Sequence, residues 1–198
     1  MEMRNRTKPT VYLFVFEGFS DWEPSYALSE INRSGEFAVQ TFGITTEPVT
    51  SMGGLTVMPN TTIDDDALLQ AAMLVLPGGE ALERGKCREI LPMLEKVCEK
   101  NVPVAAICAA TSLLADLGLL DDIKHTSNAP LYLKTVSGWY SGADYYVEEN
   151  AVTDNKIITA GGVYPVEFAR EIFKMLELYS GEKIEKWYQL YKNGLWAA

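Results

Sequence analysis

Residues 102–111 read VPVAAICAAT and pass from an apolar run into a helix-forming segment with no loop between them. The run Val102–Ile107 is continuous and apolar, as expected of a strand buried on both faces of a parallel sheet. Cys108 stands at the junction, and small residues follow it. We therefore expect Cys108 to occupy a sharp strand-to-helix turn, with its side chain above the carboxyl edge of the sheet.

Further apolar runs share this pattern, and segments with helical spacing separate them. The expected strands are Val11–Phe16, Phe37–Gly43, Met73–Leu76, Ile157–Ala160 and a short His125–Ser127, with a hairpin over Val49–Val57. The expected helices include a stripe from Ile90 to Cys98, Thr111–Leu117, a face from Val166 to Leu176, and Glu182–Tyr191. This alternation predicts an α/β fold with a mainly parallel sheet. We see no linker or repeat, so residues 1–198 are expected to form a single domain.

Composition narrows the possible partners. The chain has 198 residues, 47% of them hydrophobic, and a formal net charge of −10. An acidic surface repels phosphate backbones and anionic lipid, so we expect no nucleic-acid partner and no membrane partner. The first ten residues are polar, with no apolar leader segment, which favours a cytoplasmic protein with reduced cysteines.

Metal and cofactor chemistry find little support in the sequence. There are three cysteines and one histidine, and no Cys-x-x-Cys pair occurs. The spacing therefore predicts no structural zinc site. We expect no metal and no cofactor.

Two other strand ends carry unusual residues. Asp21 and Glu23 follow the first strand, and Gly78 and Gly79 follow Met73–Leu76. Ser20 and Glu23 have the spacing of a helix capping box, which gives Glu23 a structural explanation. The glycine pair has one too, because a tight turn needs glycine dihedrals. Ligands of open α/β sheets bind at the carboxyl ends of strands, where all these residues meet.

Cys108 allows two interpretations. A helix N-terminus behind the thiol lowers its pKa and makes it reactive. A cysteine after an apolar strand is also commonly a small buried side chain with no chemistry.

A set of motifs resembles the ThiJ/PfpI superfamily, relatives of the class I glutamine amidotransferases that include an intracellular protease and amidase branch. The resemblance runs from Val11 to about Leu178. The matching motifs are Gly18 with Asp21–Glu23 (DWE), Leu76–Gly79 (LPGG), Ala105–Thr111 (AAICAAT), Leu113–Ala115, Gly118–Leu120, His125–Asn128 (HTSN), Ile158–Ala160 and Pro165–Ala169 (PVEFA).

The resemblance implies a flavodoxin-like three-layer sandwich with a reactive cysteine at a nucleophile elbow, and relatives that commonly form homodimers. It implies that Glu23, protonated, hydrogen-bonds the Cys108 sulfur and favours the thiolate. Backbone N–H groups of Gly78 and Gly79 would hold an oxyanion. Ala109 and Asp21 join them as candidate oxyanion or substrate-binding residues.

The sequence departs from the family pattern at the histidine. Many members place a histidine directly after the cysteine or after the elbow helix, where this chain has Ala109 and Asn128. Asparagine cannot act as a general base, although its amide can donate a hydrogen bond to sulfur or an oxyanion. The single histidine, His125, lies three residues before Asn128, so on an extended strand it points away from Asn128. This puts peptidase and amidase activity in doubt.

Three hypotheses of function follow. The first is a Cys108-dependent enzyme on a small substrate, either a hydrolase or amidase or a glyoxalase-like enzyme, in which Cys108 attacks, Glu23 carries the proton and Gly79 with Asn128 holds the oxyanion. The second is a non-catalytic oxidative-stress or redox-sensing protein, in which Cys108 is oxidised. The third is a ligand-binding module that keeps only the scaffold. Trp139 and Tyr140, in a Gly-rich loop, suit a pocket wall or interface as well as they suit simple packing.

Overall fold

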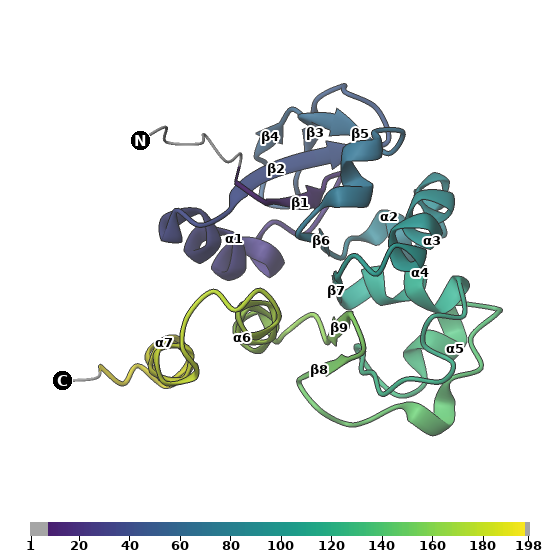
Figure 1. The fold of residues 1–198 in the computed structure, drawn as a ribbon. Helices are drawn as coiled ribbons and strands as arrows, with labels where there is room; N and C mark the ends of the chain where they lie inside the picture. Colours follow the sequence, from purple (N-terminus) through teal and green to yellow (C-terminus); the bar gives the residue numbers. More distant parts are fainter. Residues whose placement is uncertain (1–7, 197–198) are drawn as a thin grey trace.

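The computed structural model describes residues 8–196 and places a seven-stranded sheet at the centre of the molecule (Figure 1). The strand order is β5-β2-β1-β6-β7-β9-β8. All neighbours pair in parallel except β8, which runs antiparallel to β9. The strands are β1 Thr10–Phe14, β2 Ala38–Gly43, β5 Thr61–Thr62, β6 Met73–Leu76, β7 Val104–Ile107, β8 Ala151–Asp154 and β9 Ile157–Ala160.

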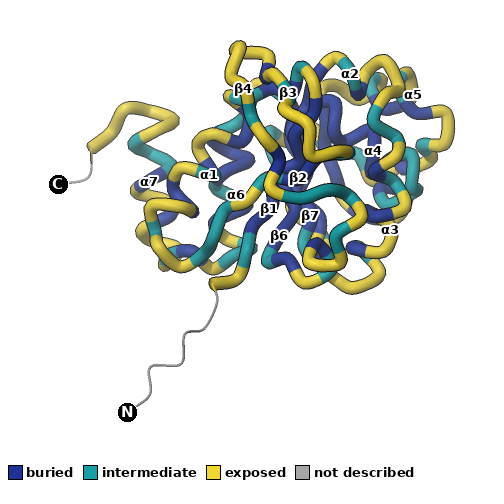
Figure 2. The backbone as a smooth tube through the Cα atoms, turned by 90° about the horizontal axis from the view of Figure 1, so that it is seen from above, coloured by how far each residue is buried: buried dark blue, intermediate teal, exposed yellow. Residues whose placement is uncertain are grey.

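Helices cover both faces of this sheet, which confirms the flavodoxin-like three-layer fold. Figures 1 and 2 place α1, α6 and α7 on one face and α2 to α5 on the other. The helices are α1 Trp22–Ser34, α2 Glu80–Glu83, α3 Leu91–Glu99, α4 Thr111–Asp116, α5 Tyr132–Val136, α6 Pro165–Met175 and α7 Gly181–Asn193. Within residues 8–196 no helix is both long enough and apolar enough to cross a bilayer.

The central strands are apolar because the two helical layers remove them from water. Every residue of β6, β7 and β9 is buried. Figure 2 shows that the buried part of the backbone lies in the middle of the molecule, between the two helical layers. The continuous apolar runs of the sequence predicted this double-sided burial. The predicted hairpin is also present as β3 Val49–Thr50 and β4 Thr56–Val57, which form a small antiparallel sheet of their own.

Two local predictions were wrong. The capping box between Ser20 and Glu23 does not form: Asp21 is the cap residue of α1, and no side chain caps the helix. The predicted strand His125–Ser127 is reduced to a single bridge between His125 and Tyr146. In both places side chains make tertiary hydrogen bonds that local sequence patterns do not encode.

His125 is fully buried and holds a loop in place. One ring nitrogen, Nδ1, lies 2.8 Å from the carbonyl oxygen of Ile123, and Nε2 lies 2.7 Å from the hydroxyl of Tyr140. The first contact makes Nδ1 the donor, so Nε2 accepts from Tyr140. Burial lowers the pKa of His125 below its usual 6.5. His125 therefore holds the loop that carries Tyr140 in place, and its ring nitrogens are not bonded to Cys108.

This burial predicts a specific pH dependence of stability. The unfolded chain binds a proton at His125 more readily than the folded chain, so the free energy of unfolding should fall as the pH drops below about 6.5, by up to about 1.4 kcal/mol per pH unit. Urea unfolding of the parent protein and of His125→Gln between pH 5 and pH 8 measures this. The difference between the two curves isolates the contribution of His125, because the carboxyl groups titrate in both proteins. Parallel curves would contradict the assignment.

Candidate active site

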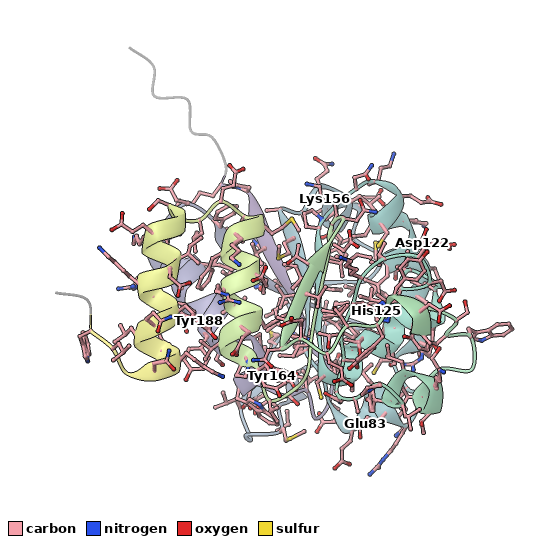
Figure 3. All side chains as sticks on the ribbon, turned by 90° about the horizontal axis from the view of Figure 1, so that it is seen from below. Glu83, Asp122, His125, Lys156, Tyr164 and Tyr188 are labelled. Atoms are coloured by element: carbon pink, nitrogen blue, oxygen red, sulfur yellow. The ribbon has the colours of Figure 1, made fainter. Side chains whose placement is uncertain are left out.

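Four neighbouring strands bring the candidate residues together at one edge of the sheet. Glu23 follows β1, Gly78 follows β6, Cys108 follows β7 and Gly162 follows β9. Parallel strands end at the same edge, so residues that lie far apart in the sequence become neighbours. In Figure 3, Tyr164, just beyond β9, lies at one end of the molecule, and Lys156, just before β9, lies at the other.

Cys108 has the strained backbone expected of an elbow. Its φ is +58°, in the left-handed region that side chains other than glycine rarely adopt. The residue connects β7 to a 3₁₀ turn, Cys108–Ala110, which leads directly into α4. The Thr111 hydroxyl donates to the Cys108 carbonyl oxygen over 2.7 Å and stabilises the turn. Strain of this kind persists where the surrounding structure over-determines it, as it does at many functional sites.

Two glycines enclose the thiol. A Cβ atom added to Gly162 would lie 2.7 Å from the Cys108 sulfur, and one added to Gly78 would lie 3.0 Å from it. No real side chain tolerates such contacts, so glycine is required at both positions because the backbone approaches the sulfur. Gly78 was predicted as a site residue, and Gly162 was not.

Asn128 contacts the sulfur, as its position in the motif suggested. Its side-chain Nδ2 donates to the Cys108 sulfur over 3.4 Å. Its Oδ1 accepts the backbone N–H of Gly162 over 2.9 Å, which fixes the orientation of the amide. Asn128 therefore presents an N–H donor to the thiol. On its other side lies Tyr132, whose hydroxyl donates to Glu83 over 3.3 Å.

Glu23 is a carboxyl group buried beside the thiol. Its side chain is almost completely inaccessible, and its Oε2 accepts the backbone N–H of Gly78 over 2.6 Å. Its Oε1 is also buried and has no well-formed hydrogen bond, and Cys108 and Ser20 are the side chains that most influence its ionisation. Burial raises the pKa of Glu23 from 4.5 to about 7. At neutral pH the group can both accept and release a proton.

Of the two interpretations of Cys108, the one with a lowered thiol pKa was wrong. Burial is the main cause, and the nearby charge of ionised Glu23 the second, that together raise the pKa of Cys108 to about 12. The N–H groups of Asn128 and Ala109 lower it, as a helix start should, but their effect is smaller. The resting pair therefore holds a thiol beside a carboxyl group that titrates near neutrality.

The backbone donors are divided between two roles. The Gly78 N–H is already bonded to Glu23, so it is not available to an oxyanion. The Ala109 N–H points to the sulfur region, and the Gly79 N–H has no acceptor among residues 8–196. Gly79 itself is required because an added Cβ would lie 2.7 Å from the Gly18 carbonyl oxygen. Neither Gly79 nor Ala109 lines the cavity that holds Cys108, so Asn128 is the predicted N–H donor that lies in the cavity itself.

Asp21 is engaged outside this site. Its Oδ2 accepts the hydroxyl of Ser51 over 2.7 Å, and this bond ties the start of α1 to the β3–β4 hairpin. It does not line the cavity that holds Cys108. Its place in the motif thus has a structural explanation.

The cavity above Cys108 has a volume of about 530 Å³, in the range of small-molecule sites. Beside the residues already described, apolar side chains from α1 and from the segment after β9 line it, namely Trp22, Val163, Tyr164 and Pro165. The sequence predicted no role at the site for these residues, because the exposure of Trp22 and Val163 is visible only in the structure. Within residues 8–196 no group of three His, Cys, Asp or Glu side chains could hold a metal ion.

The close approach of Gly162 can be tested by adding one methyl group. Gly162→Ala should displace the sulfur and lower the free energy of unfolding by about 1–3 kcal/mol, because no space exists for the new atom. Gly138→Ala is the matched control, since a Cβ there meets nothing within 4 Å. Equal urea midpoints for the two variants would show that the sulfur is not confined.

The chain matches a known protein family, and similar proteins cover nearly its whole length. The family profile described as the DJ-1/PfpI family matches residues 9–175. A Bacillus subtilis protein named uncharacterized protease YoaZ is 35% identical over 190 residues, covering 92% of this chain and 90% of that protein. The crystal structure of a thiJ/pfpI family protein from Bacillus anthracis superposes with a TM-score of 0.89 at 36% identity, covering 96% of this chain and 92% of that one.

More distant relatives carry enzyme names. The glutathione-independent glyoxalase DJR-1.2 of Caenorhabditis elegans is 26% identical over 137 residues, covering 68% of this chain and 71% of that protein. The deglycase PfpI of Pyrococcus furiosus is 26% identical over 166 residues, covering 80% and 94%. The matched residues 9–175 make up most of the chain and include Glu23, Cys108 and the two glycines that enclose the thiol. The chain belongs to the DJ-1/PfpI family.

Proposed function

We propose that the protein is a Cys108-dependent enzyme that acts on small carbonyl compounds, in the manner of a glyoxalase or deglycase. The observation that carries the proposal is the pairing of the elbow thiol with the buried Glu23 carboxyl group in a cavity of small-molecule size. The names of the two distant relatives point the same way. The proposal includes a small-molecule substrate, a homodimer and a cytoplasmic location.

The first step is addition of the thiol to the carbonyl carbon. Ionised Glu23 takes the proton from the sulfur as the new sulfur–carbon bond forms, and the electron pair of the carbonyl bond moves to oxygen. In this proposal the oxyanion is held by the side-chain N–H of Asn128, which lines the cavity, with the backbone N–H groups of Ala109 and Gly79 as further candidates. The oxygen then receives the proton from Glu23, so one carboxyl group completes the transfer.

A 2-oxoaldehyde adduct allows a second use of the same base. Glu23, ionised again, removes the proton from the former aldehyde carbon and returns it to the neighbouring carbon. The hydroxyl proton passes from the oxygen of the first carbon to the oxygen of the second, which leaves a 2-hydroxy thioester on Cys108. Water then releases a 2-hydroxy acid and restores the thiol. The net reaction consumes one water and involves no external oxidant or reductant.

Two alternatives fit the geometry less well. Peptide hydrolysis needs a group that protonates the leaving amine and a base that activates water. Asn128, at the usual histidine position, can do neither, so Glu23 would be the single group left for both. Redox sensing favours a cysteine that is already a thiolate at neutral pH, because the thiolate is the form that is oxidised. Burial and the charge of Glu23 raise the pKa of the Cys108 thiol, so a free thiolate is scarce in the resting site.

The catalytic roles can be tested with methylglyoxal consumption followed by absorbance. Cys108→Ala should abolish turnover, and Glu23→Gln should lower it by about 10²–10⁴-fold, because the general base is lost. Cys98→Ala is the matched control, since Cys98 lies in α3. Turnover by Cys108→Ala equal to that of the parent would overturn the proposal.

The pH profile tests the base independently. The pKa of Glu23 is about 7 and its ionised form is needed, so kcat/KM should rise between pH 6 and pH 8 with a midpoint near 7. Glu23→Gln should remove this limb, while Glu80→Gln, which changes an exposed carboxylate paired with Arg84, should keep it. A limb that survives in Glu23→Gln would assign the titration to another group.

A further inference from the structure

One side of the Cys108 cavity is an apolar wall. Trp22, the first residue of α1, has 47% of its surface exposed, and Val163, in the turn after β9, has 79% exposed. Tyr164 and Pro165 continue the wall into the start of α6. Large side chains exposed beside a reactive group mark a contact surface for a ligand. The flat face of an indole favours an apolar or aromatic substituent.

The cavity lining offers no positive charge. Glu23 is the only charged side chain among the residues that line it. The pKa of Glu23, about 7, makes the floor of the cavity neutral or negative near neutral pH. An anionic ligand would therefore lose its water without gaining a counter-charge.

Two cations on α6 and α7, the helices behind the wall, are occupied. The Lys192 ammonium lies 5.8 Å from the centre of the Tyr164 ring, but it is 2.8 Å from Glu167 Oε1. Glu167 is almost completely buried, so this pair is fixed between α6 and α7. The Arg170 guanidinium stacks 4.2 Å above the Tyr188 ring, which Figure 3 shows at α7. Neither side chain is free to bind a substrate carboxylate.

We infer that the Cys108 cavity selects uncharged carbonyl compounds with an apolar, flat substituent, that Trp22 determines this preference, and that carboxylate-bearing substrates are excluded. The carbonyl part of this inference rests on the proposed function. The preference for an uncharged, apolar partner rests on the wall and on the missing counter-charge. It applies to any electrophile that reaches the sulfur, which allows a test without knowledge of the natural substrate.

Alkylation of Cys108 provides the test. Iodoacetamide and iodoacetate differ in charge and little in size, and each forms a sulfur–carbon bond as iodide leaves. Rates are measured at Cys108 by peptide mass spectrometry and divided by those of free N-acetylcysteine. The corrected ratio should favour iodoacetamide by about tenfold, equivalent to about 1.4 kcal/mol at the transition state. The ratio should persist in 1 M salt, where the Debye length of about 3 Å removes the field of the whole acidic protein.

Substitutions at two positions of the wall separate the effect of charge on the reaction rate from the effect of shape. Val163→Lys adds a cation at an exposed position of the wall and should shift the ratio toward iodoacetate, whereas Val163→Gln should not. N-benzyl iodoacetamide should react faster than iodoacetamide at Cys108. Trp22→Ala should remove that advantage, and Trp22→Phe should retain it. Trp139→Ala, at a tryptophan outside the cavity, is the control.

The outcomes distinguish the two proposals. The selectivity is overturned if Cys108 is reactive but iodoacetate reacts equally well in 1 M salt, if Val163→Lys behaves like Val163→Gln, or if the benzyl advantage survives Trp22→Ala. The proposed function fails separately, if Cys108 reacts with none of the probes or if Cys108→Ala consumes methylglyoxal as the parent does. The comparison of Val163→Lys with Val163→Gln tests the effect of charge even if Trp22→Ala does not fold.

Discussion

The hydrogen bond from the Gly78 N–H to Glu23 is the interaction on which the site depends. At 2.6 Å it joins the start of α1 to the end of β6, and it buries a carboxyl group that would otherwise lie in solvent. It also explains why the capping box does not form, because the glutamate side chain is used in a tertiary contact. A donor expected to serve a substrate thus serves the base instead.

Burial of this pair sets the order in which the protons move. It raises the pKa of both groups, to about 7 for Glu23 and about 12 for Cys108, so the proton stays on sulfur until an electrophile arrives. A carboxylate of this pKa can then accept it at neutral pH without a histidine. In the proposed mechanism Glu23 takes the role that a neighbouring histidine plays in other cysteine enzymes, which is compatible with Ala109 and Asn128 at those positions.

Sequence patterns predicted the parts of this arrangement that have a period or a sharp boundary. Buried strands have continuous apolar runs, and the absence of a loop after Ile107 placed Cys108 in a turn. The contact of Asn128 came from a family motif. The approach of Gly162 and the wall of Val163 and Trp22 were missed, because they depend on how loops from β1 and β9 meet in space. The sequence left the thiol pKa open for the same reason: it indicated both a helix start and a buried cysteine, and packing decides that burial has the larger effect.

The composition of the cavity and the chemistry of the pair point to one kind of substrate. A base that must be ionised leaves a negative charge beside the sulfur, and an anionic substrate would raise the pKa of that base further and stall the first proton transfer. An uncharged carbonyl compound avoids both penalties, because it develops its negative charge only at the carbonyl oxygen as the sulfur adds. The apolar wall then supplies binding free energy without adding charge, so the missing cation suits the mechanism.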